Sequence, residues 1–486
     1  MTSSQENGDD TLDELLKDKA RIVELSDDED EDDSMAGPPF PGNHLKPRRK
    51  RKSKLHPQPQ RKLLEIPPWI FDTNELFHND VKTPSRDALD KTAAECLRFL
   101  TLLDTQGLPL NSHGLPRLRR KPHADFLRFF LGPLQTGFTA MDASRPWLFY
   151  WCIAGLSFLD EDVSEYKERL IETVRPLQNP GGGFGGGHGQ YSHCACTYAT
   201  VLALTAVGGL EVVDRRTMWQ WLGTVKQDDG GFRMAVGAEE DIRGAYCAMT
   251  IITLLNLPLE LPPDAPARKA GLTSFTDKLG GGPSNEVHGA YAFCALACLS
   301  ILDAPHISIP KYLDIDALAR WLASTQTTPE GGFAGRPNKL VDACYSHWVG
   351  ACFALIEAAL PGTKDGLWNK AALVRYLLTC GQQTGPQGGM RDKPSARPDG
   401  YHTCYSLSGL SAAQNHYWYD LESSTTDGGS GRLLAAFNWQ AKRGTADELA
   451  VLKVDEEDVV ALIHPVFVLR LEAVEAARRK FEAGGL

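Results

Sequence analysis

The chain has 486 residues, of which 42% are hydrophobic and 23% charged, a balance typical of a soluble globular protein with a substantial core. No apolar run is long enough for a membrane-spanning helix, and the N-terminus lacks the basic-then-apolar layout of a secretory signal. Eleven cysteines are an odd number, so we expect reduced thiols in a cytoplasmic protein rather than a disulfide framework.

The net charge of −11 conceals two oppositely charged blocks near the N-terminus, which largely cancel and leave an ordinary charge of about −9 on the rest of the chain. Residues 1–34 carry 14 acidic and 3 basic side chains, and residues 46–62 carry 9 basic and no acidic ones. Such stretches bury too little apolar surface to offset the entropy of ordering, so we expect residues 1–62 to be a disordered tail. The basic stretch resembles a nuclear-localisation or polyanion-binding patch. No basic stripe continues past it, so nucleic-acid binding by the body of the chain is not expected.

The remaining residues, 63–486, are predicted to form one all-α domain. Apolar residues recur at helical spacings of three and four, and alternating β-branched runs are nearly absent. The clearest helices are predicted at 87–105, 145–159, 165–177 and 317–326. We expect 421–448 to be a loop insertion and 449–486 to be a C-terminal helical segment.

A Gly-Gly turn recurs through this domain. It occurs at Gly183, Gly231, Gly281, Gly332 and Gly389, at spacings of 48, 50, 51 and 57 residues. The helix before the turn often ends in glutamine, and the helix after it is apolar on nearly all sides, as buried helices are. This internal repeat predicts an α/α toroid, a barrel of two concentric helical layers around an aromatic-lined cavity. An open helical array is the alternative.

The buried helices align on an aromatic position near their N-termini. Three residues before Tyr198, Tyr246, Tyr291, His347 and Tyr405 stand Ala195, Arg243, His288, Cys344 and His402. Core packing would favour apolar residues there, whereas helix N-termini attract anions. We therefore predict that the chemistry of the protein lies at one end of the barrel.

Three residues at that end suit a zinc ion. Asp342, Cys344 and His402 form a mixed donor set that leaves a fourth coordination position for a substrate, as catalytic zinc sites do. A cysteine and a histidine are more often ordinary core residues, but their shared position in the repeat favours the metal. The chain body has no CxxC pair, so a structural zinc finger is not expected.

A cationic group is predicted beside the metal. His288, Arg336 and Lys339, with Tyr345, suit a diphosphate better than a carboxylate; surface salt bridges are the alternative. The barrel interior is expected to be lined by Trp147, Tyr150, Trp151, Tyr198, Tyr246, Tyr291, Trp348 and Tyr405. A metal for a thiol, cations for a diphosphate and aromatic walls for an apolar chain together indicate thiol prenylation.

The segments that carry these residues resemble a known family. DASRPWLFYW, GGFGGGHGQYSH, DIRGAYCA, GRPNKLVDACYSHW and DGYHTCYSLSGLS are similar to the β subunits of protein prenyltransferases, and among these to the farnesyltransferase type, fungal in character. The resemblance covers roughly residues 67–420. It implies a toroid that works with a separate helical-repeat α subunit. It also implies farnesyl transfer from farnesyl diphosphate to the cysteine of C-terminal Cys-a-a-X (CaaX) sequences, such as those of Ras-like GTPases.

The resemblance also implies roles for individual residues. Zinc would be held by Asp342, Cys344 and His402, and the diphosphate by His288, Arg336, Lys339 and Tyr345. The isoprenoid would contact Trp147, Tyr150, Tyr198, Arg243, Tyr246, Cys294 and Trp348, and the peptide would pass Trp151, Arg243 and Tyr401. Asp392, followed by Lys393, matches a position implicated in Mg²⁺ binding. Cys196 stands where the family pattern has a proline, so the a-a-X preference is open.

Three alternatives were weighed against this interpretation. A type I geranylgeranyltransferase β subunit shares the toroid and the zinc site, but the bulk of Trp147 is expected to shorten the pocket. A terpene cyclase needs an acidic DxDD or DDxxD set, and the acidic residues at 160–162 lie outside the repeat register. A non-catalytic scaffold does not explain a metal triad beside cations.

Overall fold

The computed structural model describes residues 83–105, 107–260, 262, 285–360, 366–422 and 432–482. The chain divides into two units, Met1–Arg49 and Lys50–Leu486, and all described residues belong to the second. The expected tail at 1–62 and the turn at Gly281 lie outside the described residues.

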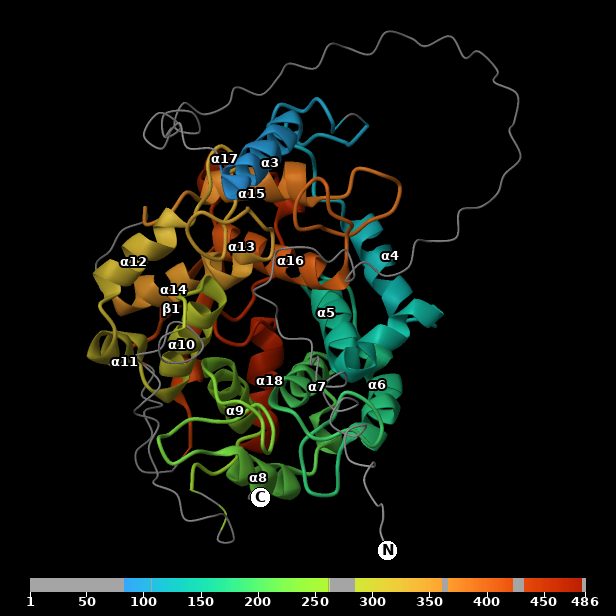
Figure 1. The fold of residues 1–486 in the computed structure, drawn as a ribbon, viewed down its shortest axis with the longest axis vertical. Helices are drawn as coiled ribbons and strands as arrows, with labels where there is room; N and C mark the ends of the chain where they lie inside the picture. Colours follow the sequence, from blue (N-terminus) through green and yellow to red (C-terminus); the bar gives the residue numbers. More distant parts are fainter. Residues whose placement is uncertain are drawn as a thin grey trace, which may run out of the picture. The chain divides into compact units, whose positions relative to one another are not determined.

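Within the second unit, one set of helices forms a closed ring (Figure 1). Each of these inner helices packs against the next, and the last of them, α16, packs against the first, α5. This closure confirms the predicted toroid and excludes an open array. In chain order the inner helices are α5 (Arg145–Phe158), α7 (Cys194–Val207), α9 (Ile242–Leu254), α10 (Gly289–Leu302), α13 (Tyr345–Trp348) with its continuation α14 (Gly350–Ala359), and α16 (Gly400–Gln414).

The remaining helices lie outside the ring or at its ends. They are α3 (Pro84–Leu100), α4 (Arg120–Phe130), α6 (Lys167–Val174), α8 (Arg215–Val225), α11 (Pro305–Tyr312), α12 (Ile315–Ser324), α15 (Lys370–Tyr376), α17 (Ala446–Leu452) and α18 (Leu471–Phe481). Inner and outer helices differ in burial as the sequence predicts. The inner helix α10 is buried on nearly every side, whereas the outer helix α12 buries only one stripe, Ile315, Leu318, Ala319 and Leu322. No helix among the described residues is both long and apolar enough to cross a bilayer.

Short 3-10 and π turns connect these helices. The 3-10 turns are η2 (Thr136–Ser144), η3 (Ser164–Tyr166), η4 (Arg175–Leu177), η5 (Leu210–Val212), η7 (Ala435–Asn438) and η8 (Glu456–Asp458). The π turn η6 (Leu377–Gly381) extends α15.

The Gly-Gly turns have one structure in four repeats. An antiparallel bridge closes each turn: Gln178 with Phe184, Lys226 with Phe232, Gln326 with Phe333, and Gln382 with Met390. Two of the glutamine side chains, those of Gln326 and Gln382, bond segments outside their own turn. Gln326 Nε2 donates to the carbonyl of Asn369, and its Oε1 accepts from the Asn369 N–H, both at 2.9 Å. Asn369 caps α15, so Gln326 joins its Gly-Gly turn to the start of the next outer helix.

The range predicted as a loop insertion, 421–448, contains a strand. β2 (Trp439–Arg443) pairs antiparallel with β1 (Asn415–Tyr419), which continues directly from α16. Beyond α17, the segment 459–469 is almost fully buried, and the N–H of Ala461 donates to the carbonyl of Phe158 at the end of α5 (3.0 Å).

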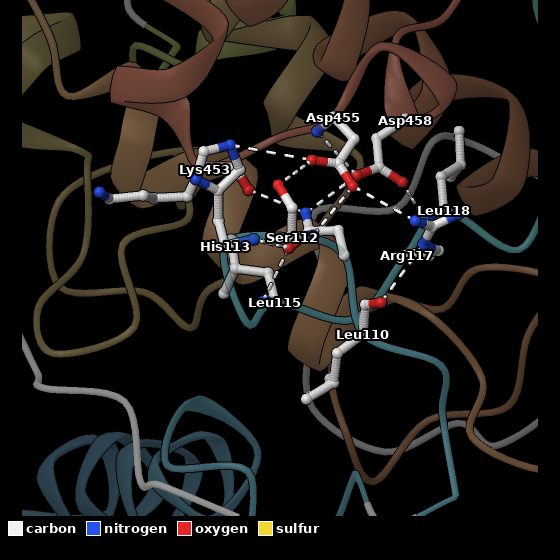
Figure 2. A network of polar contacts seen from close by, with 10 residues as sticks. Leu110, Ser112, His113, Leu115, Arg117, Leu118, Lys453, Asp455 and Asp458 are labelled. Atoms are coloured by element: carbon white, nitrogen blue, oxygen red, sulfur yellow. Dashed lines mark hydrogen bonds and ion pairs between the residues drawn. The ribbon is translucent and has the colours of Figure 1, made fainter.

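A polar cluster ties the start of the toroid to its C-terminal part (Figure 2). We call it the clasp; it comprises Asn111, Ser112, His113, Arg117, Asp455 and Asp458. The buried Asp458 accepts from the Leu118 N–H (2.8 Å) and from Asn111 Nδ2 (2.9 Å). Asp455 accepts from the N–H and hydroxyl of Ser112 and lies 3.4 Å from Arg117 Nη2. Each clasp carboxylate therefore has protein donors on both oxygens.

Candidate metal centre and active site

The three predicted metal ligands meet at the N-terminal ends of two inner helices. Cys344 is the N-cap residue of α13, and His402 is the third residue of α16. One donor atom each from Asp342, Cys344 and His402 lies within 4.8 Å of the others. Asp342 Oδ1 is 3.3 Å from His402 Nε2 and also accepts from the Cys344 N–H (2.7 Å). The structure thus brings together the triad that the sequence predicted.

Asp399 orients the histidine of this triad. It is the N-cap residue of α16: its Oδ1 accepts from the His402 N–H (2.7 Å), and its Oδ2 bonds His402 Nδ1 (2.6 Å). With Nδ1 held in this way, Nε2 faces Asp342. A carboxylate behind the far nitrogen of a histidine is the usual outer shell of a zinc-bound imidazole, yet the sequence analysis did not single out Asp399. Its place at the helix start before His402 was the available signal.

The charges of the triad depend strongly on one another. Burial would lower the pKa of His402, but Asp399 and Asp342 raise it well above its ordinary value. Burial would raise the pKa of Asp342, but the neighbouring His402 lowers it to about 2. Burial and Asp342 raise the pKa of the Cys344 thiol. A carboxylate, an imidazole and a thiol in such close contact fit a divalent cation of zinc type, because its charge favours the deprotonated sulfur and nitrogen donors.

The predicted diphosphate group adjoins the triad through Tyr345, the residue after Cys344. Its hydroxyl is 3.2 Å from Nε2 of His288, the N-cap residue of α10. Gly335 permits this approach, because a Cβ there would lie 2.4 Å from the His288 ring nitrogen. The half-buried Arg336 follows and pairs with Glu286. Lys339 has no ion-pair partner within the ranges that the structure describes.

Asp392 lies close to the triad. Its carbonyl accepts from the Ala343 N–H (3.0 Å) and from the Tyr376 hydroxyl (2.7 Å), and its carboxylate pairs with Lys393. Burial, then the nearby Asp342, raises the pKa of Asp392 to about 7. The Oδ1 atom of Asp392 is buried without a hydrogen-bond partner. A buried carboxylate oxygen in this state suits a further cation.

The inner helices carry a closed belt of aromatic rings. Neighbouring ring centroids around the belt are between 4.6 and 5.8 Å apart. In order around the toroid, the members are Trp147, Tyr198, Tyr246, Phe293, His347, Tyr405, Tyr401 and Trp151, which returns to Trp147. Tyr150 contacts Trp147 and Tyr198, and Trp348 contacts Tyr405. The predicted aromatic residues therefore lie together, except that on α10 the residue in the belt is Phe293 and not Tyr291.

Phe293, not Tyr291, is the belt residue of α10. Counted from the N-cap, Tyr198, Tyr246 and Phe293 all stand five residues into their helices. Tyr291 stands only three residues in, and its ring lies under the guanidinium of Arg243 at 5.5 Å. Alignment by residue type pairs tyrosine with tyrosine, whereas the direction in which a side chain leaves the helix depends on its distance from the cap. Alignment on the caps would have found Phe293 from sequence.

Tyrosines of the belt and beside it contact the C-terminal segment. The Tyr150 hydroxyl donates to the carbonyl of Val468 (3.0 Å) and the Tyr246 hydroxyl to that of Val466 (2.6 Å). Tyr198 in turn bonds the Tyr246 hydroxyl (3.2 Å). No sequence motif indicated this role for residues 466–468, because apolar residues joined through backbone carbonyls leave no chemical signature.

The other predicted contact residues are also buried or half-buried beside the belt. Cys294 follows Phe293 and is buried. Arg243 pairs with Asp241, the N-cap residue of α9. Trp348 Nε1 donates to the Tyr401 hydroxyl (3.0 Å). Cys196, which departs from the family pattern, is buried with its sulfur 3.3 Å from the carbonyl of Ala143.

Comparisons with known proteins agree with this geometry. Residues 118–469 match the family model of the prenyltransferase alpha-alpha toroid domain. The chain is 45% identical to a protein farnesyltransferase subunit beta of Pyricularia oryzae, over 85% of this chain and 84% of the relative. It is 36% identical to the corresponding Schizosaccharomyces pombe subunit, over 67% and 85%. Among solved structures, Candida albicans protein geranylgeranyltransferase-I complexed with GGPP matches with a TM-score of 0.56 at 19% identity, covering 76% of this chain and 100% of that one. This last likeness concerns the fold alone.

Proposed function

The chain belongs to the family of protein farnesyltransferase β subunits, and from this premise we propose that it is the catalytic subunit of a zinc-dependent protein farnesyltransferase. The reaction transfers the farnesyl group of farnesyl diphosphate to the cysteine thiol of a CaaX protein, such as a Ras-like GTPase, with loss of diphosphate. The observation that carries the proposal is the Asp342–Cys344–His402 triad beside the His288–Tyr345 pair.

Asp342, Cys344 and His402 would hold the zinc ion. Bound there, the ion lowers the pKa of the incoming peptide thiol so that a thiolate is present at neutral pH. Asp399 fixes the tautomer and orientation of His402 through Nδ1. Because the zinc ligand Cys344 and the diphosphate-binding Tyr345 are consecutive residues, the peptide thiol would lie next to the farnesyl carbon that bears the diphosphate.

The cationic group acts on the leaving group. As the bond between the farnesyl carbon and its oxygen lengthens, negative charge grows on the diphosphate. His288, Arg336, Lys339 and Tyr345 would stabilise that charge by hydrogen bonds and ion pairs. Asp392, with its unpartnered buried oxygen, would hold the Mg²⁺ that accompanies the diphosphate, and Lys393 beside it would balance its charge in the absence of the cation.

The aromatic belt would receive the isoprenoid and exclude water. Trp147, Tyr150, Tyr198, Tyr246, Cys294 and Trp348 would contact the apolar chain, while Trp151, Arg243 and Tyr401 would guide the peptide. An α subunit would complete the enzyme. All eleven cysteines are unpaired, which supports a reducing, cytoplasmic environment.

The experiment that tests the proposal uses the full-length chain co-expressed with an α subunit of the family. We expect one zinc per β subunit and consumption of farnesyl diphosphate in preference to geranylgeranyl diphosphate when the two compete for a CaaX peptide. Preference for the longer donor would favour the alternative, a type I geranylgeranyltransferase β subunit. No transfer with either donor would refute both.

Trp147 offers the sharper test between these two enzymes. It stands in the first turn of α5, after Pro146, and packs against Tyr150 and Tyr198. Without a steric block, each additional methylene that fits would favour binding by about 0.8 kcal/mol, so the longer donor would bind at least as well. Trp147→Thr should raise the ratio of geranylgeranyl to farnesyl single-turnover rates. An unchanged ratio of the two rates in a folded variant would mean that Trp147 does not set the depth of the isoprenoid pocket.

A further inference from the structure

Three consecutive residues of α13 are each hydrogen-bonded to α16. These contacts join Ser346 Oγ to the Tyr405 carbonyl (3.3 Å), His347 Nδ1 to Ser408 Oγ (3.0 Å) and Trp348 Nε1 to the Tyr401 hydroxyl (3.0 Å). The helices approach closely at Gly409, where a Cβ would lie 2.0 Å from Ser346 Oγ. Hydrogen bonds are directional, so these three contacts hold α13 in one orientation against α16, which apolar packing alone would not do.

The two helices carry two of the three triad residues. The four residues of α13 form the first turn of the helical segment that continues into α14, and Cys344 precedes them without a side-chain cap. The first turn of a helix is held by few hydrogen bonds of its own, so its position depends on contacts with neighbouring elements. His402 lies in the first turn of α16. The placement of α13 against α16 therefore contributes to the distance between the Cys344 sulfur and His402 Nε2.

His347 is the member of this contact whose chemistry needs explanation. It occupies a belt position held by tyrosine or phenylalanine on α7, α9, α10 and α16, and its ring contacts Phe293 (4.6 Å), Trp348 (4.9 Å) and Tyr405 (5.1 Å). It is 2% exposed, and its Nε2 is buried without a hydrogen-bond partner. Burial lowers the pKa of His347 to about 3, so the ring is neutral.

A phenyl ring would fill the same space without a buried, unpartnered nitrogen. Burying such a nitrogen opposes folding, so aromatic packing alone does not account for a histidine here. What the imidazole adds over a phenyl ring is the bond from Nδ1 to Ser408. That bond joins side chain to side chain in the middle of the contact, between the helices of Cys344 and His402.

We propose that His347 and Ser408 are positioning residues of the metal centre: their hydrogen bond holds α13 against α16 and thereby fixes Cys344 relative to His402. The inference rests on the zinc site of the proposed function and assigns that site a supporting pair outside its ligands and Asp399. Neither residue contacts the ion, so their effect is on the geometry and affinity of the site.

The test measures metal binding without turnover. His347→Phe keeps the ring and removes the bond, Ser408→Ala removes the other partner, and Ser408→Thr keeps a hydroxyl. Zn²⁺ affinity is measured on the co-purified αβ complex by competition with a chromophoric chelator, and the ligand geometry by the absorption bands of the Co²⁺-substituted protein. We expect about tenfold weaker zinc binding and shifted cobalt bands in each of the first two variants. Their combination should be no worse than either alone, because both remove one bond, and Ser408→Thr should bind zinc like the wild type.

His464→Phe is the matched control. His464 is also 2% exposed, is bonded through Nε2 to the Ala436 carbonyl (2.9 Å) and stacks on Phe467 (4.7 Å). His464→Phe likewise replaces a buried imidazole and removes its hydrogen bond, and it should keep its zinc affinity. Unchanged zinc affinity in folded His347→Phe, equal losses in His464→Phe, or additive losses in the double variant would each overturn the inference. The proposed function is judged separately, by donor consumption in the wild type.

Discussion

The triad and the clasp are built from the same kinds of residue and do different work. Both combine aspartate and histidine, and both join segments distant in sequence. In the clasp, Asp458 is surrounded by N–H donors from Leu118, Asn111 and Asp455. In the triad, Asp342, Cys344 and His402 direct their donor atoms at one another. The carboxylates of the clasp have their hydrogen-bond acceptors satisfied by protein donors, whereas the atoms of the triad that face one another could coordinate a cation.

The difference follows from where each group stands relative to the backbone. Clasp carboxylates lie beside the free N–H groups of turns, which neutralise them locally and convert their charge into stability. At the metal centre that position belongs to Asp399, which caps α16 outside the triad, while Asp342 accepts, among the described residues, a single backbone N–H, that of Cys344. Asp399 leaves His402 oriented but still facing Asp342 and a thiol. Side chains remain available to bind a ligand where backbone N–H groups do not satisfy their hydrogen-bonding capacity.

The largest expected effect separates metal from fold at the triad. Cys344→Ala and His402→Ala should each lose zinc and lower farnesyl transfer by about a thousandfold or more, on the order of 4 kcal/mol, while helical content stays unchanged. Metal analysis, single-turnover rates and circular dichroism measure the three quantities. Full zinc occupancy in either variant would contradict the ligand assignment.

Next in size is the cationic group. Lys339→Ala should lower the single-turnover rate by one to three decades, about 1.4 to 4 kcal/mol, because the charge developing on the diphosphate loses a cation. Zinc content should not change. If peptide affinity alone fell while the chemical rate stayed constant, Lys339 would not act on the leaving group.

Asp399 combines the roles of the two regions, since it caps a helix as a clasp carboxylate satisfies a turn, and it also orients His402 of the triad. Asp399→Asn keeps an N-cap residue of comparable quality and weakens the bond to His402 Nδ1. We expect a 10- to 100-fold loss of zinc affinity, the range typical of such outer partners, with little loss of stability. Equal affinity in a chelator titration would mean that α16 alone orients His402.

The clasp should show the opposite pattern. Asp458→Asn replaces an acceptor with an amide that faces N–H donors, which should lower the free energy of unfolding by about 1–3 kcal/mol. Zinc affinity and the farnesyl-transfer rate of the folded protein should not change. Urea unfolding and chelator titration of one preparation provide both values. A change in zinc affinity would show that the clasp and the triad are coupled.

The smallest effect is a pH dependence at Asp455. Hydrogen bonds from the hydroxyl and N–H of Ser112 lower the pKa of Asp455 below the ordinary range of an aspartate. A carboxyl whose folded-state pKa is depressed stabilises the fold above its unfolded pKa, and this stabilisation is lost as the pH falls through the folded value. Asp455→Asn should therefore be less stable than wild type at pH 7, and the gap should narrow below about pH 4. A gap that stayed constant with pH would assign the effect to packing.

Much of this arrangement could be predicted because it repeats. The Gly-Gly turns recur at a nearly regular spacing, often after a helix that ends in glutamine, so the helix pairs, their burial and their common end follow from the pattern. The triad was found for the same reason, since Cys344 and His402 occupy the start of equivalent helices. Asp399 was missed because a capping aspartate is ordinary at any helix start, and Phe293 because tyrosines were matched to tyrosines.

By itself, the sequence determined the α/α toroid, the meeting of Asp342, Cys344 and His402 and most of the aromatic belt, because each depends on residue type at a repeated position. Only the tertiary structure decided the rest. It brought the carbonyls of Val466 and Val468 to the belt hydroxyls, joined residues 111–118 to 455–458 in the clasp, and set His347 against Ser408. These contacts link residues from 61 to more than 300 positions apart, and they depend on how the ring of helices closes.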